Sequence, residues 1–430
     1  MIAPASKLLW TAALIVVPLC AMTAFAPLLV AIGLLAVGLV AVWDARQSLR
    51  ILRRVRISLP ERVTWFQGRA SSLPFELANA SARVQQVRVF LALPGDMPNG
   101  SAGETYTLPP SATASGLPAA CTPGERGHFL LTHAELEVAS PLQLWHAHAV
   151  CSVTSEIRVY PDLREDRASL LVARQSTGTQ RQRQLGKGRE FEKLRDYLPG
   201  DSFDEIHWRA SARHGKPIVK VTQVERTQQV YVVLDSSRLS ARHGVLDRFV
   251  HAALGLAMAA ETQGDRFGLV LFSNQVDAFV RAGSGRAHFA TCRDAIYTVQ
   301  PRRVSPDFDE LFSFLQLRIR TRSLLLFLTA LDDPLLAEMF LKSMRIVARR
   351  HLLMVSVPHL SGARPLFTGE LPTQPEEIYA DLAGHMQWTQ LRALAGTLER
   401  AGVRLTSVDL RRATADVARQ YFDVKRRQLL

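Results

Sequence analysis

The stretch from Leu8 to Trp43 contains no charged side chain, and this feature constrains the fold more than any other. As one helix it would be about 54 Å long at about 1.5 Å per residue, whereas the hydrocarbon core of a bilayer is about 30 Å thick. Segments of about 17 residues are enough to cross that core, so two short helices with a turn near Ala26 and Pro27 fit the stretch better. The sequence therefore predicts a transmembrane helical hairpin over residues 1–45.

A cleaved signal peptide is the competing interpretation of the same stretch. The apolar part of a signal peptide has about 7–15 residues, which is about half of the length found here. The stretch also lacks a convincing cleavage site of small residues. We therefore favour the membrane hairpin over the signal peptide.

Basic residues flank the apolar stretch on both sides. Lys7 precedes it, and a basic juxtamembrane linker over residues 46–57 follows it. Because basic flanks stay in the cytoplasm, the soluble domains are predicted to face the cytoplasm. The linker is also predicted to contact anionic lipid headgroups. Its arginines are Arg46, Arg50, Arg53, Arg54 and Arg56.

Length and composition limit what the rest of the chain can be. A chain of 430 residues exceeds the usual size of one core, so at least two globular parts are expected. Hydrophobic residues make up 47% and charged residues 21%, which excludes wholesale disorder. The four cysteines lie far apart without metal-ligand spacing, so we expect free thiols in a reducing compartment.

The formal net charge of +13 raises the question of nucleic-acid binding. The best basic segment, residues 181–189, has no recognised nucleic-acid-binding fold or aromatic platform beside it, so we predict no nucleic-acid partner. The short glycine pairs at 186–188 and 283–285 lack the Lys-Ser/Thr ending of a phosphate-binding loop. The sequence thus predicts no cofactor.

Residues 58–162 have the pattern of a small β-sandwich. Short alternating apolar runs, such as 135–138, are separated by Pro, Gly and Ser. The stretch from Pro94 to Gly124 lacks periodicity and is predicted to be a loop without its own core. His146 and His148 would lie on one face of a strand, but without a carboxylate or cysteine partner nearby a metal site is the weaker interpretation.

From about Val230 onward, apolar strands alternate with amphipathic helices. This alternation predicts a mostly parallel sheet flanked by helices. The expected strands are 230–234, 267–272, 324–328, 352–357 and 403–408. One expected helix begins near Leu246 and ends before Gly264. The other expected helices cover 287–299, 307–319, 334–349, 386–400 and 411–426.

The densest local signal is the segment from Gly188 to Val224. Ser202 with Glu205 three residues later fits a helix capping box, and a helix from there should end at Gly215. A strand, residues 218–224, should follow. Charges of both signs in this segment predict a network of ion pairs and hydrogen bonds.

This segment resembles the signature of the bacterial domain of unknown function 58 family, approximately E-F-x-x-L-R-x-Y-x-P-G-D-x-x-R-x-I-x-W-x-x-S-A-R. The matching residues are Glu190, Phe191, Leu194, Arg195, Tyr197, Pro199, Gly200, Asp201, Ile206, Trp208, Ser211, Ala212 and Arg213. Glu205 departs from the pattern, close to where relatives often carry Arg. The apolar hairpin and the C-terminal α/β region also look similar to this family.

The resemblance implies a function. It suggests a membrane-tethered, non-enzymatic interaction or scaffold protein of the bacterial cytoplasmic (inner) membrane, working with a MoxR-type AAA+ ATPase in a process of the cell envelope. The residues expected to bind the partner are Arg195, Asp196, Tyr197, Pro199, Gly200, Asp201, His207, Trp208, Ser211 and Arg213. The alternative is that they only join the sandwich to the α/β domain, because ion-pair networks are commonly structural.

The family is also similar to von Willebrand factor A domains, which makes residues 185–430 the signature segment plus an α/β domain of that Rossmann-like type. Those domains bind Mg²⁺ through a D-x-S-x-S loop with a later Thr and Asp. Here the loop has Asp235 and Ser237 but Leu239 in place of the last Ser, and Ala330 stands where the later Asp is expected. Ser305 and Asp332 are possible substitutes.

With two defects in one small site, we predict a degenerate site around Asp235 and Ser237 that holds no metal. A metal-dependent ligand-binding protein remains the alternative function.

An enzyme is the third hypothesis. Asp204, His207 and Ser211 have the spacing of one helix face and suggest a hydrolase. Residues on one helix rarely converge on a substrate, and neither G-x-S-x-G nor H-E-x-x-H occurs in the sequence. We therefore predict that the chain is not an enzyme.

Overall fold

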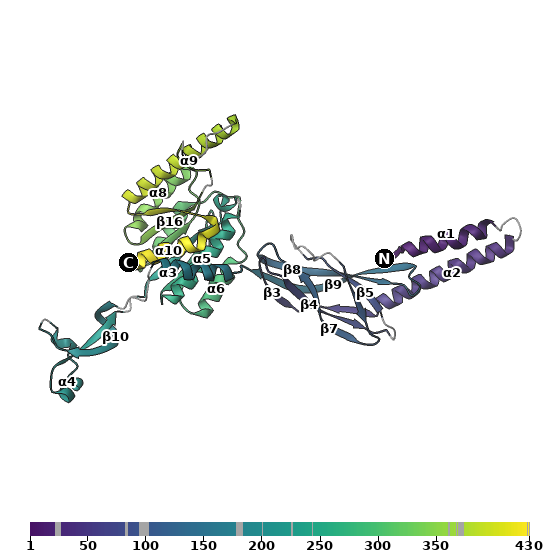
Figure 1. Ribbon diagram of the computed structural model, residues 1–430, viewed down its shortest axis with the longest axis horizontal. Helices are drawn as coiled ribbons and strands as arrows, with labels where there is room; N and C mark the ends of the chain where they lie inside the picture. Colours follow the sequence, from purple (N-terminus) through teal and green to yellow (C-terminus); the bar gives the residue numbers. More distant parts are fainter. Residues whose placement is uncertain are drawn as a thin grey trace. The chain divides into compact units, whose positions relative to one another are not determined.

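The structure is a computed structural model with a mixed α/β fold and several sheets (Figure 1). It divides into two compact units, Met1–Asp162 and Leu163–Leu430. The described residues are 1–21, 27–81, 85–93, 103–177, 184–199, 201–224, 227–242, 244–359, 362–366, 368, 374–427 and 429.

Two helices, α1 (Ser6–Ala21) and α2 (Pro27–Leu52), form the N-terminal apolar region. Within the described residues, only the segment Val30–Leu52 is long and apolar enough to cross a membrane. Just 11% of its apolar window is buried, whereas the core helix of a soluble protein would be mostly buried. This exposure indicates a membrane-associated helix. Of the predicted turn, Pro27 begins α2, and Ala26 lies outside the described residues.

The first unit holds two packed β-sheets, as the alternating pattern predicted. Strands β1 (Ile2–Pro4), β9 (Trp145–Tyr160), β8 (Gly127–Ala139), β5 (Gln85–Leu91) and β6 (Glu104–Leu108) are neighbours in this order, and β3 (Arg62–Phe66) pairs with β9. The other sheet consists of β2 (Val55–Ser58), β4 (Ser71–Asn79) and β7 (Thr113–Cys121). Alternate residues of both sheets, such as Leu73 and Val87, share one hydrophobic core.

The prediction of a coreless loop from Pro94 to Gly124 is wrong for its described part. Strands β6 and β7 lie within it, and Leu108 and Cys121 are buried in the core. The Pro, Gly and Ala residues hid the alternation of apolar side chains. Pro118 is tolerated because β7 is an edge strand, where a missing backbone N–H leaves no central pairing unmade. Residues 94–102 lie outside the described part.

Within the first unit, a buried aspartate joins α2 to the β-sheets. Asp44 is fully buried, and its carboxylate accepts hydrogen bonds from the Ser140 hydroxyl and, at 3.0 Å, from the backbone N–H of Leu142. The Trp145 indole N–H donates to the Ala41 carbonyl at 3.0 Å. The helix is therefore held to the turn between β8 and β9 by polar contacts as well as by packing.

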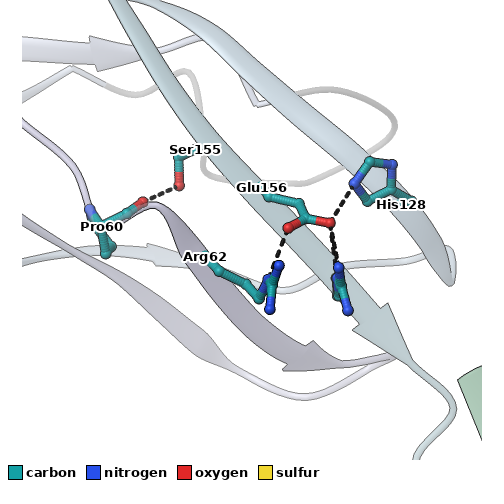
Figure 2. Close-up of polar contacts among 6 residues, drawn as sticks. Pro60, Arg62, His128, Ser155 and Glu156 are labelled. Atoms are coloured by element: carbon teal, nitrogen blue, oxygen red, sulfur yellow. Dashed lines mark hydrogen bonds and ion pairs between the residues drawn. The ribbon is translucent and has the colours of Figure 1, made fainter.

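Glu156 on β9 is the centre of a charged cluster that ties three strands together (Figure 2). Its carboxylate accepts from Arg62 of β3 at 2.8 Å, from Arg158 at 2.6 Å, and contacts His128 of β8 at 2.9 Å. The contacts with Arg62 first, and then with Arg158, lower the pKa of Glu156 from 4.5 to about 2. The Glu156 carboxylate therefore stays ionised over most of the pH range in which proteins are stable.

Replacing Glu156 by Gln is expected to make the first unit less stable at neutral pH but not in acid. A carboxylate with a lowered pKa stabilises the folded state above its unfolded pKa, and this contribution is lost as the pH falls toward the folded pKa. The stability difference between the wild type and Glu156→Gln should therefore shrink as the pH falls from 4.5 to about 2. Thermal unfolding across this range measures it. Glu135→Gln, at an exposed position of β8, is the control, and an equal pH response of both variants would contradict the assignment.

The second unit contains a six-stranded sheet in the order β14 (Val276–Gly283), β13 (Arg266–Phe272), β12 (Gln229–Asp235), β15 (Leu324–Leu328), β16 (Leu352–Pro358) and β17 (Arg404–Val408). All neighbours are parallel except β13 and β14. The five strands predicted from apolar runs are confirmed. The antiparallel edge strand β14 was not predicted.

Helices cover both faces of this sheet (Figure 1). One face packs against α3 (Arg164–Thr177), α5 (Val245–Thr262), α6 (Arg286–Ile296) and α10 (Ala413–Arg426). The other packs against α7 (Phe308–Arg318), α8 (Pro334–Ala348) and α9 (Pro375–Arg400). Side chains of β12 alternate between the two cores, with Val232 on the first face and Val233 on the second.

Two of the helices that cover this sheet differ from the predictions. Helix α9 begins about a dozen residues before the predicted start at 386, and α3 was not predicted. Asp166 fastens α3: it pairs with His251 of α5 at 2.7 Å and accepts from the Thr414 hydroxyl of α10. Burial alone would raise the pKa of Asp166, but these hydrogen bonds outweigh burial and lower it.

Candidate functional site

The signature segment forms a small hairpin with an ordered connection. Strand β10 (Gln184–Asp196) pairs antiparallel with β11 (Ile218–Val224), with Arg195 opposite Val219. The connection carries a short 3-10 helix, η2 (Phe203–Glu205), and helix α4 (Trp208–His214). Strand β11 is as predicted, whereas β10 was not predicted.

The predicted capping box is wrong. The Ser202 side chain caps nothing, and only η2 follows it. The helix proper begins later, with His207 as its N-cap: the His207 Nδ1 accepts from the backbone N–H of Ala210 at 3.1 Å. Gly215 ends the helix with a positive φ of 66°, as predicted, because glycine adopts this conformation without strain.

The predicted ion-pair network is present in the described part of the segment. The Arg195 guanidinium binds both carboxylate oxygens of Asp201, at 2.7 and 2.6 Å. Asp201 also accepts from the backbone N–H of Leu198 at 2.9 Å, and these contacts, Arg195 first, lower its pKa. Lys216 pairs with Asp196 at 2.7 Å. A bidentate pair fixes orientation as well as distance, so Arg195 and Asp201 are held in one relative orientation.

The Ser211 hydroxyl links the start of α4 to the start of β11. Its hydroxyl donates to the His207 carbonyl at 3.1 Å and accepts from the backbone N–H of Ile218 at 2.9 Å. The His207 ring faces the N–H of Ala210, so the described contacts of Ser211 and His207 are with the backbone. This geometry gives no support to a nucleophile and base among Asp204, His207 and Ser211.

Large apolar side chains protrude from this ordered connection. Leu198 is 59% exposed, Phe203 is 72% exposed and Trp208 is 70% exposed. Tyr197 stacks on Phe203 with ring centroids 6.1 Å apart. Sequence analysis identified Trp208 and Tyr197 but missed Leu198 and Phe203, although both lie within the signature segment.

The remaining predicted site residues contribute less. Pro199 and Arg213 are exposed, and Gly200 lies outside the described residues. The side chains of Glu190, Phe191 and Glu205 also lie outside the described part.

Asp235 lies at the carboxyl end of β12, where the sheet order changes direction between β12 and β15. It is fully buried, and both carboxylate oxygens are occupied. One accepts from the backbone N–H of Ser237 at 2.8 Å, and the other accepts from the Thr329 hydroxyl at 2.6 Å. Burial raises the pKa of Asp235 despite these hydrogen bonds. Sequence analysis did not identify Thr329 as its partner.

Two arginines take up the oxygens that a metal would need. Arg238 donates to the Ser305 hydroxyl and to Asp333, both at 3.0 Å, and Arg242 pairs with Asp332 at 2.5 Å. We name the pairs Arg238–Asp333 and Arg242–Asp332 the arginine clasp. They join the loop after β12 to the loop after β15.

The residues present therefore do not fit a magnesium site. Leu239 packs in the hydrophobic core, and the two substitutes considered above, Ser305 and Asp332, are bound to arginines. Among the residues that the structure describes, no group of three His, Cys, Asp or Glu side chains is placed to hold a metal ion. His146 pairs with Glu137 at 2.8 Å, so its neighbour is a single carboxylate across the strands.

Residues 193–361 match the family model "Protein of unknown function DUF58". The match covers less than half of the chain and begins after Glu190 and Phe191, so the resemblance is shown for this part only. No curated protein matches the chain.

Several solved structures resemble parts of the chain. The conserved hypothetical protein BatB from Bacteroides thetaiotaomicron is 10% identical, with a TM-score of 0.29, over 46% of this chain and 99% of that one. An aerotolerance-related membrane protein from Bacteroides fragilis is 9% identical, with a TM-score of 0.30, over 46% and 98%. Proximal thread matrix protein 1 from the mussel byssus is 15% identical, with a TM-score of 0.28, over 46% of each. At these scores none of the three determines the function of this chain.

Proposed function

We propose that this protein is a membrane-tethered, non-enzymatic interaction protein and that the segment from Leu194 to Arg213 binds its partner. By the resemblance to the DUF58 family, the partner is a MoxR-type AAA+ ATPase working in a process of the cell envelope. The observation that carries the proposal is the exposure of Leu198, Phe203 and Trp208 on a connection held rigid by Arg195 and Asp201.

Rigid, exposed aromatic side chains are typical anchors of protein interfaces. Binding energy concentrates in a few Trp, Tyr and Arg side chains that enter pockets of the partner. A connection that is already ordered loses little conformational entropy on binding. Phe203 and Trp208 are both more than two-thirds exposed, so their side chains are available to a partner.

We further propose that α1 and α2 form a membrane hairpin whose two ends lie in the cytoplasm. Strand β1, before α1, pairs with β9, and α2 leads directly into β2 of the same unit. A chain that leaves this unit through α1 and returns through α2 crosses the bilayer an even number of times. Removal of α1 as part of a signal peptide would also remove β1 from the sheet. The arginines 46–56 favour the cytoplasmic side.

We also propose that the second unit is a von Willebrand factor A-like domain that has lost its metal. The parallel order of β13, β12, β15 and β16, and the position of Asp235 at the end of the central strand, support this assignment. The arginine clasp takes the place of the cation. The domain would then present partner-binding surfaces without metal-dependent ligand binding.

Replacing Trp208 by alanine is expected to weaken binding of the purified ATPase about thirtyfold or more, because truncating an aromatic anchor costs about 2 kcal/mol or more. Binding is measured on sealed inverted membrane vesicles, which expose the cytoplasmic face, and on right-side-out vesicles. The wild type should bind the ATPase only on inverted vesicles.

The matched control for this experiment is Tyr379→Ala on α9. Tyr379 is 72% exposed, which is close to the exposure of Trp208, but it lies outside the signature segment. It should leave ATPase binding unchanged. Equal binding by wild type and Trp208→Ala would reject the docking role, and binding only on right-side-out vesicles would reject the orientation.

A further inference from the structure

We propose that the groove between α8 and α9 is a second docking site, which takes an acidic amphipathic helix of a partner protein. The groove has a volume of about 1040 Å³. It is lined by α8 and α9, two of the helices that cover one face of the six-stranded sheet, and it is separate in sequence from the signature segment. The inference therefore does not depend on the proposed function.

Part of the lining of the groove is apolar. It comes from α8 and includes Leu335, Met339, Leu341 and Met344. Leu335 is 67% exposed and Met339 is 37% exposed, so apolar surface on α8 remains open to a partner. Exposed apolar side chains grouped along one groove mark an interaction site, whereas single ones are ordinary.

The walls of the groove are basic. Four basic side chains line it against one acidic side chain, Glu338. The basic residues are Lys342, Arg345, Arg349 and Arg400. Arg400 is fixed by hydrogen bonds from its guanidinium to the Gly396 carbonyl at 3.1 Å and to the Thr397 hydroxyl at 3.2 Å. Basic residues in a last turn also suit the helix dipole, but Lys342 lies too far from the end of α8 for that explanation.

The groove continues toward the carboxyl edge of the sheet. A second cavity of about 290 Å³ shares Glu338, Leu341 and Thr397 with it. A third, of about 370 Å³, shares Leu331, Asp332 and Leu391 with the second and reaches the arginine clasp, where Asp332 is paired with Arg242. The track thus runs along the whole of α8, which has 15 residues and is about 22 Å long.

The shape and charge of this track select one kind of occupant. An apolar stripe along an extended groove is complementary to the apolar face of an amphipathic helix. Basic walls are complementary to acidic side chains that flank this stripe, and they disfavour a basic partner by like-charge repulsion. A helix of four turns with Leu on one face and Glu beside it satisfies both conditions.

A fluorescent peptide of about 15 residues, helical in design, with Leu on one face and Glu on its flanks, tests the site. Its anisotropy is measured with the full-length protein in nanodiscs of neutral phosphatidylcholine. The wild type should bind the peptide, and a peptide with Lys in place of Glu should not bind. The double variant Lys342→Glu, Arg345→Glu should bind at least about tenfold more weakly.

Matched controls separate the groove from general effects of charge and apolarity. Arg281→Glu with Arg286→Glu makes the same change in net charge at exposed positions around β14 and α6. Leu335→Asp should abolish binding, whereas Leu317→Asp, at a leucine that is 73% exposed on α7, should not. Melting temperatures of all variants establish that they fold, and the milder Lys342→Ala, Arg345→Ala variant replaces any that does not.

Peptide binding that is unaffected by both groove variants would overturn the proposal. A second result would also overturn it. If the acidic peptide does not bind the wild type, and the groove variants lose binding to phosphatidylserine vesicles, the groove contacts anionic lipid and not a protein helix.

Discussion

Replacing Asp265 by alanine should lower the free energy of unfolding of the second unit by about 3–5 kcal/mol. Asp265 is 2% exposed and precedes β13. Its carboxylate accepts from the Lys425 ammonium of α10 at 2.8 Å, from the Tyr421 hydroxyl, and from the backbone N–H of Gln228 at 3.1 Å. Alanine would leave a largely buried ammonium without its acid. Helix α10 would lose one of its polar attachments to the sheet and keep the hydrogen bond between Ser356 and Gln420.

The measurement is hydrogen–deuterium exchange of α10 and β13 in increasing urea, on the full-length protein in detergent. Asp423→Ala is the control, because Asp423 lies on the same helix and pairs with Arg426 at 3.2 Å on the surface. Exposed pairs contribute about 0–1 kcal/mol, so this variant should stay near the wild type. Equal destabilisation by the two replacements would show that the buried contacts of Asp265 contribute no more to the free energy of unfolding than the surface pair of Asp423.

Replacing Asp44 by alanine should cost about 2–4 kcal/mol locally, because two hydrogen bonds to a buried carboxylate are lost. The hydroxyl of Ser140 would lose its acceptor, and so would the backbone N–H of Leu142. Hydrogen exchange in the turn between β8 and β9 should then accelerate by more than about tenfold. The end of α2 would be released from the first unit while its membrane segment stayed in place.

Two variants test whether this effect belongs to the carboxylate. Asp44→Asn keeps one acceptor oxygen and should retain part of the protection, whereas Arg46→Ala, exposed in the same helical turn, should change nothing in this region. Exchange in the β8–β9 turn that is as slow in Asp44→Ala as in the wild type would contradict the assignment.

The sequence predicted the second unit better than the first for a physical reason. Central strands such as β12 and β15 are buried on both faces and therefore read as uninterrupted apolar runs. Strand β14 is only half-buried and carries Asp277 and Arg281, so it lacks that signal. Strand β7 was missed because small residues and a proline replace the branched side chains that usually mark a strand. Strand β6 does carry threonines and a tyrosine, but it has only five residues.

The candidate site was predicted in its charges but not in its geometry. Charges of both signs predicted a network of ion pairs without assigning its partners, and the structure pairs Arg195 with Asp201 in bidentate form. The start of α4 was misplaced because a capping box is defined by spacing alone, whereas His207 can cap only through the particular orientation of its ring. Exposure of Phe203 depends on the fold of the whole connection, which no local pattern records.

The arginine clasp joins the two loops at the carboxyl edge of the sheet through side chains of the protein itself, without a bound metal ion. A bound cation can dissociate, so loops closed by one respond to chelators and to scarcity of the ion. Guanidinium groups belong to the chain and stay charged at every pH that cells reach. The contacts between these two loops therefore do not depend on the supply of an ion, and a binding partner that competes for Asp332 and Asp333 would open them.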